Sequence, residues 1–260
     1  MELTVVLVIV ALLLGGLLVP FGTQRDVEFM RATEKSLVDI REALIGFAAI
    51  NGRLPCPAQA TIASGTANAG IEATSGSGTT LTCACSAIAD PGVATFGSGV
   101  ACSTSSSPHT VSGVLPWATL GLLETDAWGN RFTFHLTYFF GRGANPASGL
   151  FGSSCTPSTT PTAAAFALCT PGGITILTAA SGGTTLASSA PAVVVSHGGN
   201  GLGAYNTLGT KLSSAGASAD ETENADGDAT FVSNTTIDDR LIWISTPQLM
   251  NRMMTAGKLP

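Results

Sequence analysis

The chain has 260 residues, of which 11 are basic and 17 acidic, so only 11% are charged, against roughly 25% in an ordinary soluble domain. The net charge of −6 excludes the basic footprint of a nucleic-acid-binding protein. An ordinary disordered chain is also excluded, because 45% of the residues are hydrophobic. Seven of the 17 acids lie in 220–239, which holds no Lys or Arg, so the charge imbalance belongs to one segment.

The N-terminal region contains an apolar run at residues 3–19 with no charged side chain. As a helix this run would span about 25 Å, at the low end for a membrane crossing. The alternative is a secretory signal peptide, which needs a basic segment before the run and a small-residue cleavage site after it. Met1-Glu2 and Pro20 stand there instead. We therefore expect a retained membrane helix.

An amphipathic helix continues beyond Pro20. Apolar residues that form one stripe from about 27 to 50 are Met30, Leu37, Ile40, Leu44 and Phe47. Such a stripe indicates a helix that packs against the protein's own sheet. Asn51-Gly52 is the predicted stop. We expect one helix of about 48 residues, with a weak point between 15 and 22.

All six cysteines follow this helix, at Cys56, Cys83, Cys85, Cys102, Cys155 and Cys169. An even number of cysteines in a loop-rich region favours disulfides. Cys155 and Cys169 should pair because they flank one short segment. Cys83 and Cys85 should each pair with Cys56 or Cys102, in an order that the sequence leaves open. A zinc site is disfavoured because Cys-x-Cys is not a usual zinc spacing.

Strand signals follow in the second half of the chain. Alternating apolar and polar residues over 131–140 predict a half-buried strand with His135 on its polar face. Further strands are expected at 174–177, 192–196 and 241–244. Thr246 as N-cap and Pro247 at the first helical position predict a C-terminal helix that runs to Ala256, with Gly257 as its stop.

Two long segments, 58–113 and 143–172, read as insertions between regular elements. The first is rich in Ala, Ser, Thr and Gly and should be held by cysteines rather than by a core. Such loops either carry a binding function or decorate the surface, and the sequence leaves both readings open.

The acidic segment 220–239 is the one candidate metal site. Asp220, Glu223, Asp226 and Asp228 offer hard oxygen ligands that suit Ca²⁺. An EF-hand alignment fails, because Ser233 stands where that motif has a bidentate Glu. The segment is either a solvated acidic loop or a calcium site.

Catalytic motifs are absent from the sequence. The three histidines lie in unrelated contexts, and there is neither a nucleophile elbow nor a phosphate-binding loop. We therefore expect the protein not to be an enzyme.

Two segments resemble a known family. The run from Glu2 through Leu3-Thr4-Val5-Val6-Leu7 to Val10 is similar to the N-terminus of type IV pilins and type II secretion pseudopilins, and Asp126-Ala127-Trp128-Gly129-Asn130 is similar to a turn of major pseudopilins. This resemblance implies an α+β pilin-like fold: a long helix with a transmembrane half (1–22) and an amphipathic half (23–52) packs on a small antiparallel sheet. The exported domain (53–260) then carries the disulfide-bearing loops.

The resemblance also implies a function. The chain is expected to be a structural subunit, pilin or pseudopilin, of a pilus or secretion filament. Its partners are then other subunits, contacted through the N-terminal helix, together with the inner membrane, the assembly machinery and the prepilin peptidase. Glu2 would neutralise the N-terminal amine of a neighbouring subunit, and Pro20 would let the helix loosen during assembly. Calcium binding by the acidic segment would fit the same family.

The family is made with a basic leader, which is removed before the new N-terminus is methylated. Met1 stands directly before Glu2, so we expect the true start to lie upstream. The expected location is a single-pass inner-membrane protein with a periplasmic domain that enters a periplasmic or extracellular filament. The alternatives are a surface-binding minor pilin or tip adhesin, and a membrane-anchored periplasmic protein that does not assemble.

Overall fold

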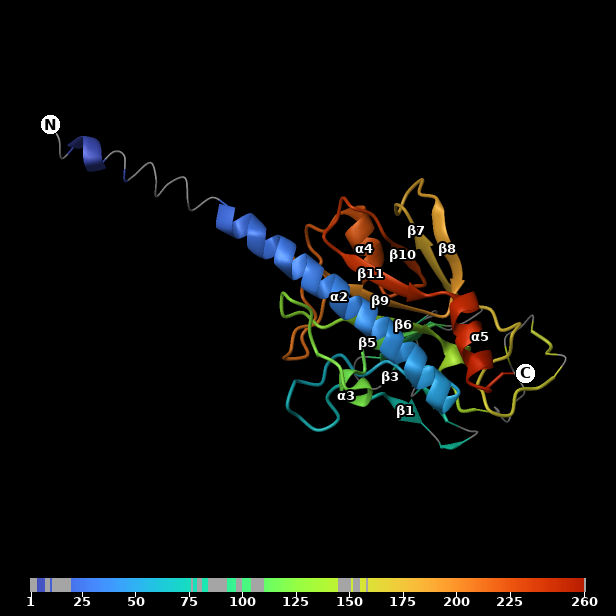
Figure 1. Cartoon of the computed structure of the whole chain (residues 1–260). Coiled ribbons are helices and arrows are strands. Elements are labelled where there is room, and N and C mark those ends of the chain that lie inside the picture. The colour runs from blue at the N-terminus through green and yellow to red at the C-terminus, as the bar shows by residue number, and fades with distance from the viewer. Residues whose placement is uncertain are drawn as a thin grey trace.

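The computed structural model describes residues 4–7, 10, 20–75, 77, 78, 81–83, 93–96, 100–103, 110–144, 151, 155–157 and 159–259. Within these ranges the chain forms a body of sheets with one long helix along its side (Figure 1). Glu2, Cys85 and the junction from 11 to 19 lie outside the described residues.

The long helix is α2, Pro20–Asn51. Its buried residues lie on one face and include Thr33, Leu37, Ile40, Leu44, Ile45 and Ala48. The helix ends where the sequence predicts, because Gly52 takes a left-handed conformation (φ +73°) and donates its N–H to the Ala48 carbonyl over 2.8 Å.

The largest sheet has six strands in the order β11-β9-β6-β5-β4-β3. Its members are β3 (Val93–Phe96), β4 (Val100–Ser103), β5 (Thr110–Val114), β6 (Thr133–Thr137), β9 (Ala192–Ser196) and β11 (Arg240–Ile244), all antiparallel. A second sheet holds β10 (Thr230–Val232), β7 (Ile174–Leu177) and β8 (Thr185–Ala190), and here β10 and β7 run parallel. A third pairs β1 (Thr74–Ser75) with β2 (Thr82–Cys83).

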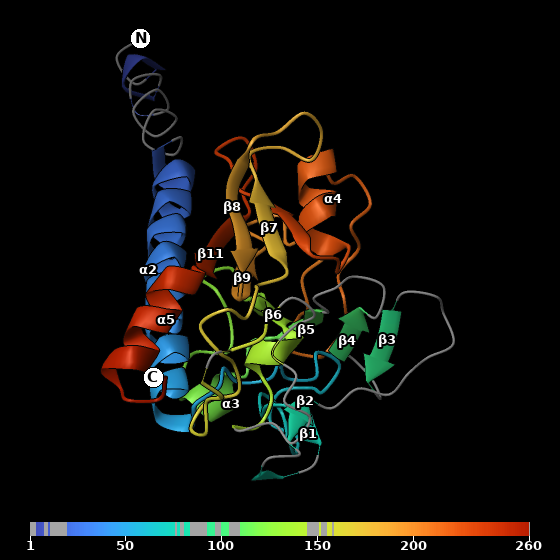
Figure 2. The same cartoon turned by 90° about the vertical axis from the view of Figure 1, so that its right-hand side faces the viewer.

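The remaining helices are short. They are α3 (Trp117–Leu120), the 3₁₀ turn η2 (Tyr138–Phe140), α4 (Ala219–Ala225) and α5 (Thr246–Thr255). Figure 2 shows α5 beside α2 on one side of the body. The strands predicted at 174–177 and 192–196 and the C-terminal helix are confirmed, although the cap of that helix is Ser245 rather than Thr246.

The predicted fold class was wrong. The chain is a mixed α/β structure with three sheets, one of which contains a parallel pair, in place of one small antiparallel sheet beside a pilin-type helix. The parallel pair joins 174–177 to the distant segment 230–232, and the local patterns used for the prediction carry no information on such pairing.

The predicted location in the inner membrane was also wrong. In the described part of the chain, no helix combines the length and the apolarity needed to cross a membrane. Most of the predicted span, 1–22, lies outside the described residues. The long helix that is described, α2, carries nine charged side chains among its 32 residues, which excludes it as a membrane span: Arg25, Asp26, Glu28, Arg31, Glu34, Lys35, Asp39, Arg41 and Glu42.

The inner strands β6 and β9 of the six-stranded sheet are buried on both faces, because alternate side chains of a strand point to opposite sides. On one side, Phe134, Leu136 and Val194 join a core with the buried face of α2 and with α5. On the other side, Val193 and Val195 pack against the three-stranded sheet around Phe231. The residues that the sequence assigns to a polar face of β6 are therefore enclosed.

Described parts of segment 58–113 are built into the body. Ala58 and Ala60 are fully buried, and β5 is an inner strand of the largest sheet. Arg131, also fully buried, ties this segment to the body: its guanidinium donates to the Ala60 carbonyl over 2.9 Å and to the Glu124 carboxylate over 2.8 Å. The sequence missed this because small residues make a weak strand signal.

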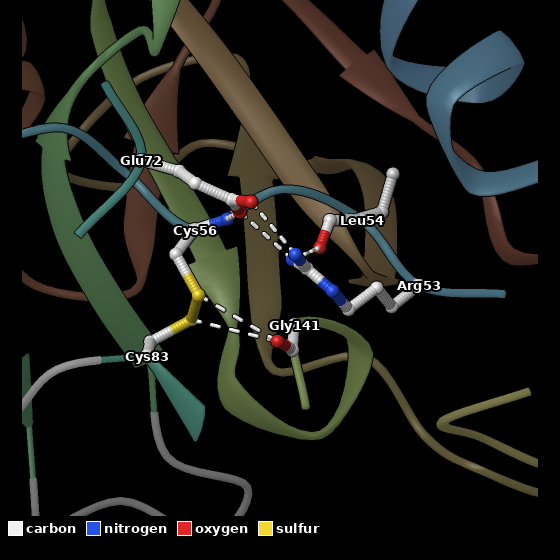
Figure 3. The surroundings of a disulfide bond; sticks show 6 residues. All are labelled: Arg53, Leu54, Cys56, Glu72, Cys83 and Gly141. Carbon is white, nitrogen blue, oxygen red and sulfur yellow. Dashed lines mark hydrogen bonds and ion pairs between the residues drawn. A yellow bond between two sulfur atoms is a disulfide. The ribbon is translucent and has the colours of Figure 1, made fainter. Parts of the chain in front are cut away.

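Two disulfides are present among the described residues. The predicted Cys155–Cys169 bond is confirmed, and Cys56 pairs with Cys83, one of the two partners left open. Figure 3 shows the second bond beside an ion pair in which Arg53 and Glu72 make two hydrogen bonds of 2.7 and 2.8 Å. Glu72 also accepts a hydrogen bond from the Cys56 N–H over 3.0 Å. The Cys56–Cys83 disulfide and the Arg53–Glu72 ion pair therefore hold the same part of the chain in place.

Candidate functional site

The N-terminal helix exposes apolar side chains. In the described residues ahead of α2, the side chains of Val5, Val6 and Leu7 are 58–60% exposed, and that of Val10 is 45% exposed. Figure 1 shows the first turns of α2 projecting beyond the sheets, with residues 4–7 farther out still. Pro20 is the first residue of α2. These apolar side chains are therefore not part of the protein's own core.

The turn at Asp126–Asn130 forms as a compact unit against α2. The Asp126 carboxylate accepts hydrogen bonds from the N–H groups of Trp128 (3.0 Å) and Asn130 (2.9 Å) and from the Ser196 hydroxyl (2.7 Å). Burial raises the pKa of Asp126, and these hydrogen bonds work against that rise. Trp128 meets Phe29 of α2 edge to face, with ring centroids 6.1 Å apart. The turn thus braces the exposed half of the helix.

Three of the four predicted calcium ligands accept hydrogen bonds within the protein. Asp220 accepts from the Ala180 N–H and from Asn234, while Asp226 and Asp228 accept from the N–H groups of Asp228 and Thr230, respectively. Burial and the neighbouring acids Asp228, Asp226 and Asp220 raise the pKa of Glu223. No group of three or more metal-binding side chains occurs within the described ranges.

Part of the acidic segment is a helix, not a loop. Ser218 caps α4 by accepting from the Glu221 N–H, and the Glu221 carboxylate accepts from the Ser218 N–H in return. This capping box satisfies two free donors at the helix start, which explains why a seven-residue polar segment is helical. The four acids are thereby distributed over a helix and the turn that follows it, and the prediction of a calcium site gains no support.

A polar cavity lies between β5, β6 and the segment from His197 to Gly227. Its volume is about 300 Å³. Its lining includes His135 and His197, which are 2% and 0% exposed, together with Ser112, Thr133, Tyr205 and Lys211. The two histidines were predicted to lie in unrelated contexts, and that prediction was wrong. We call this space the histidine cavity.

The two imidazoles have few partners. Nε2 of His197 lies 2.9 Å from the Thr133 hydroxyl, and its Nδ1 is 4.0 Å from a carboxylate oxygen of Asp239. Among the described residues, Nδ1 of His135, Nδ1 of His197 and Oδ1 of Asp239 are buried without a hydrogen-bond partner. Such groups are rare in folded proteins, because each has lost its water without replacement.

Burial sets the charge of these groups. It lowers the pKa of His135 to about 3 and that of His197 to about 4, with the nearby Lys211 ammonium acting in the same direction. It raises the pKa of Asp239 to about 7. Both imidazoles are therefore neutral at neutral pH, and each can donate one hydrogen bond and accept another.

Comparison with known proteins gives no relative: neither a family model, nor a curated protein, nor a solved structure matches the chain.

Proposed function

We propose that this protein is a structural subunit that assembles with copies of itself through its N-terminal helix, in the manner of the type IV pilins and pseudopilins that its N-terminus resembles. One observation carries the proposal: the apolar side chains of Val5, Val6, Leu7 and Val10 are about half exposed and lie away from the body. Exposed apolar surface of this kind marks an interaction site.

The energetics favour association of helices. Full burial of one Val or Leu side chain contributes about 1.5–3 kcal/mol, so covering these half-exposed side chains contributes on the order of 1 kcal/mol each. The gain recurs at every subunit of an assembly. The disulfides support the same proposal, since they are typical of chains that fold in an oxidising compartment.

The geometry supports an assembly in which the helices are central and the bodies lie outside. Among the side chains of α2 that the structure describes, the buried apolar ones in the core come from its C-terminal half, from Leu37 to Ala48. Upstream, Trp128 and Thr33 hold the helix to the Asp126–Asn130 turn, which limits its direction relative to the body. A fixed direction lets many copies repeat one contact.

The first test is Val6→Asp in the full-length chain. We expect this variant to lose assembly, because a carboxylate inside a bundle of apolar helices is desolvated without a partner. The measurement is negative-stain electron microscopy with sedimentation of assembled material. The matched control is Leu208→Asp, a substitution of an apolar residue that is 74% exposed on the body. Assembly by Val6→Asp, or loss of assembly in both variants, would contradict the proposal.

The second test separates specific assembly from general apolar association. By the resemblance, Glu2 sets the register between subunits through a charge pair that a dry helix core strengthens. Glu2→Ala makes the segment more apolar, so unspecific association should increase. We expect the variant instead to fail to enter wild-type filaments while its melting temperature is unchanged. Normal incorporation would refute the role of Glu2.

A further inference from the structure

The exposed side of α2 carries a stripe of side chains that the protein's own body does not cover. Its residues are spaced three or four apart, so they lie along one side of the helix: Arg25, Glu28, Ala32, Lys35 and Asp39. All five are exposed. Figure 2 shows α2 at the edge of the molecule, with the sheets on one side of it. We call these five residues the charged stripe.

The charges of the stripe have no partner in the part of the chain that the structure describes. Its two cations and two acids make neither an ion pair nor a side-chain hydrogen bond with a described residue. Other acids of the same helix are paired, since Glu34 lies 3.8 Å from Arg240 and Glu42 lies 3.2 Å from Arg252. The stripe is therefore available to charges from another molecule.

The order of the charges makes the stripe complementary to itself. From residue 25 to residue 39 the stripe reads positive, negative, neutral, positive, negative. If a second copy lies antiparallel with Ala32 on the two-fold axis, Arg25 faces Asp39 of the second copy and Glu28 lies beside Lys35 of the second copy. Symmetry repeats both pairs. A parallel pair in register would instead place each charge opposite its like, so the pattern favours the antiparallel orientation.

The surroundings of Ala32 suit a contact between two helices. A small residue at the crossing lets the helix axes approach to about 8 Å. Two apolar side chains flank the stripe: Val38 is 44% exposed, and Leu123, which lines a small pocket together with Asp39, is 71% exposed. Arg31 is a like charge near the two-fold axis, but it lies about 100° round the helix from Ala32 and can extend into solvent.

We propose that the charged stripe is an interaction surface for a second copy of this chain, which pairs with it antiparallel around Ala32. Exposed ion pairs contribute little each, so the pair is weak and sensitive to salt. Pairing uses residues 25–39, whereas filament assembly was proposed from the apolar side chains at 5–10, so the two proposals are independent. A filament that repeats one contact keeps its helices in one direction, and the antiparallel pair therefore belongs to the unassembled protein.

The first experiment is disulfide crosslinking of the full-length protein after any filaments have been removed by sedimentation. Ala32→Cys should give a covalent dimer under mild oxidation, because residues on the two-fold axis meet across the interface. Arg25→Cys is the matched control. In the antiparallel pair its two copies are about 21 Å apart, the rise from residue 25 to residue 39, which a disulfide cannot span. The wild-type protein shows how much crosslinking its own cysteines produce.

The second experiment exchanges charges in the Ala32→Cys protein. Lys35→Glu should lower the yield of covalent dimer at least about tenfold, because two attractions across the interface become two repulsions. Adding Glu28→Lys to that variant exchanges the two charges and should restore the yield. Arg25→Asp combined with Asp39→Arg repeats the test on the outer pair.

The matched control for the charge changes is Glu223→Lys on α4, which lies on the other side of the sheets from α2 (Figure 2) and should leave the yield unchanged. Three results would each overturn the proposal: Ala32→Cys gives no more dimer than the wild type, Arg25→Cys crosslinks as readily as Ala32→Cys, or the charge exchange fails to restore the dimer. Melting temperatures report folding, and if a variant of the inner pair unfolds, the outer pair decides the test.

Discussion

Two buried histidines make the stability of this protein depend on pH. The pKa of His135 is lowered to about 3 by burial, and to a smaller extent by the nearby His197 and Lys211, whereas an exposed histidine in the unfolded chain titrates near 6.5. Between these values the unfolded chain binds a proton that the folded chain does not. The free energy of unfolding therefore falls as the pH drops below about 6.5.

His135→Phe should remove the part of this dependence that His135 contributes, while the part that His197 contributes remains. The variant has no imidazole at position 135 to protonate in the unfolded state. When the pH is lowered from 7.5 to 5.5, its free energy of unfolding should therefore fall by about 1 kcal/mol less than that of the wild type. Urea unfolding at a series of pH values measures the difference. Asp239, with its pKa raised to about 7, acts in the opposite direction in both proteins and cancels in the comparison. Parallel stability curves would show that His135 titrates normally.

The end of α2 depends on one glycine. Gly52 has φ +73°, and a Cβ atom built there would lie 2.1 Å from the Ala163 carbonyl oxygen. The chain after the helix can therefore pass beside 163–165 only with glycine, and Ala165 donates its N–H to the Gly52 carbonyl over 2.8 Å. This contact joins the helix end to a segment more than 100 residues further along the chain.

Gly52→Ala should destabilise the protein by several kcal/mol, because strain at positive φ adds to a clash with backbone. Gly65→Ala is the matched control, since Gly65 has φ +76° and no other atom lies within 4 Å of the place that an added methyl group would take. We expect the control to lose only about 1 kcal/mol. Chemical denaturation of both variants gives the comparison, and equal losses would mean that Ala163 moves away at little cost.

Elements with a strong local pattern could be predicted from the sequence. The strands at 174–177 and 192–196 combine β-branched residues with flanking Gly or Pro, and the C-terminal helix has Pro247 at its start and Gly257 after its end. Elements made by polar or small residues could not. The helix α4 is formed by its cap, and β3 and β4 contain residues such as Ala and Ser that favour no single structure.

The histidine cavity was missed for a different reason. His135 alternates with apolar residues, and this pattern normally places the polar side chains in water. Here a second sheet covers that face, and its parallel pair joins 174–177 to 230–232. The contact between two faces from distant segments is a tertiary property. The one sequence signal for this cavity was the combination of a polar face on the strand that holds His135 with His197 directly after a buried strand.

At the scale of the whole molecule, the two described disulfides have different surroundings, because Cys56 and Cys83 belong to the main core whereas Cys155 lies in a small separate cluster. Among the described residues, Cys155 of the Cys155–Cys169 bond lies in a small buried cluster with Phe151 and Ala167. The Cys56–Cys83 bond joins two loop-rich segments across 27 residues. A disulfide stabilises the folded protein mainly by reducing the conformational entropy of the unfolded chain.

Cys56→Ala combined with Cys83→Ala should lower the free energy of unfolding by about 3–4 kcal/mol, as loop closure over 27 residues predicts. Cys155→Ala with Cys169→Ala, which opens a separation of 14 residues, should lose about 3 kcal/mol. Guanidinium unfolding under non-reducing conditions measures both. A double variant with wild-type stability would mean that its bond does not constrain the unfolded chain.

The contacts of α2 also determine when the protein can fold. Its buried face meets β11 and α5, whose residues come some 200 positions later in the chain. Contacts so far apart in sequence form slowly, and these cannot form until residues 240–255 have been made. The nascent chain therefore leaves part of the apolar face of α2 uncovered until residues 240–255 emerge, so this part of the face is available to a chaperone during synthesis.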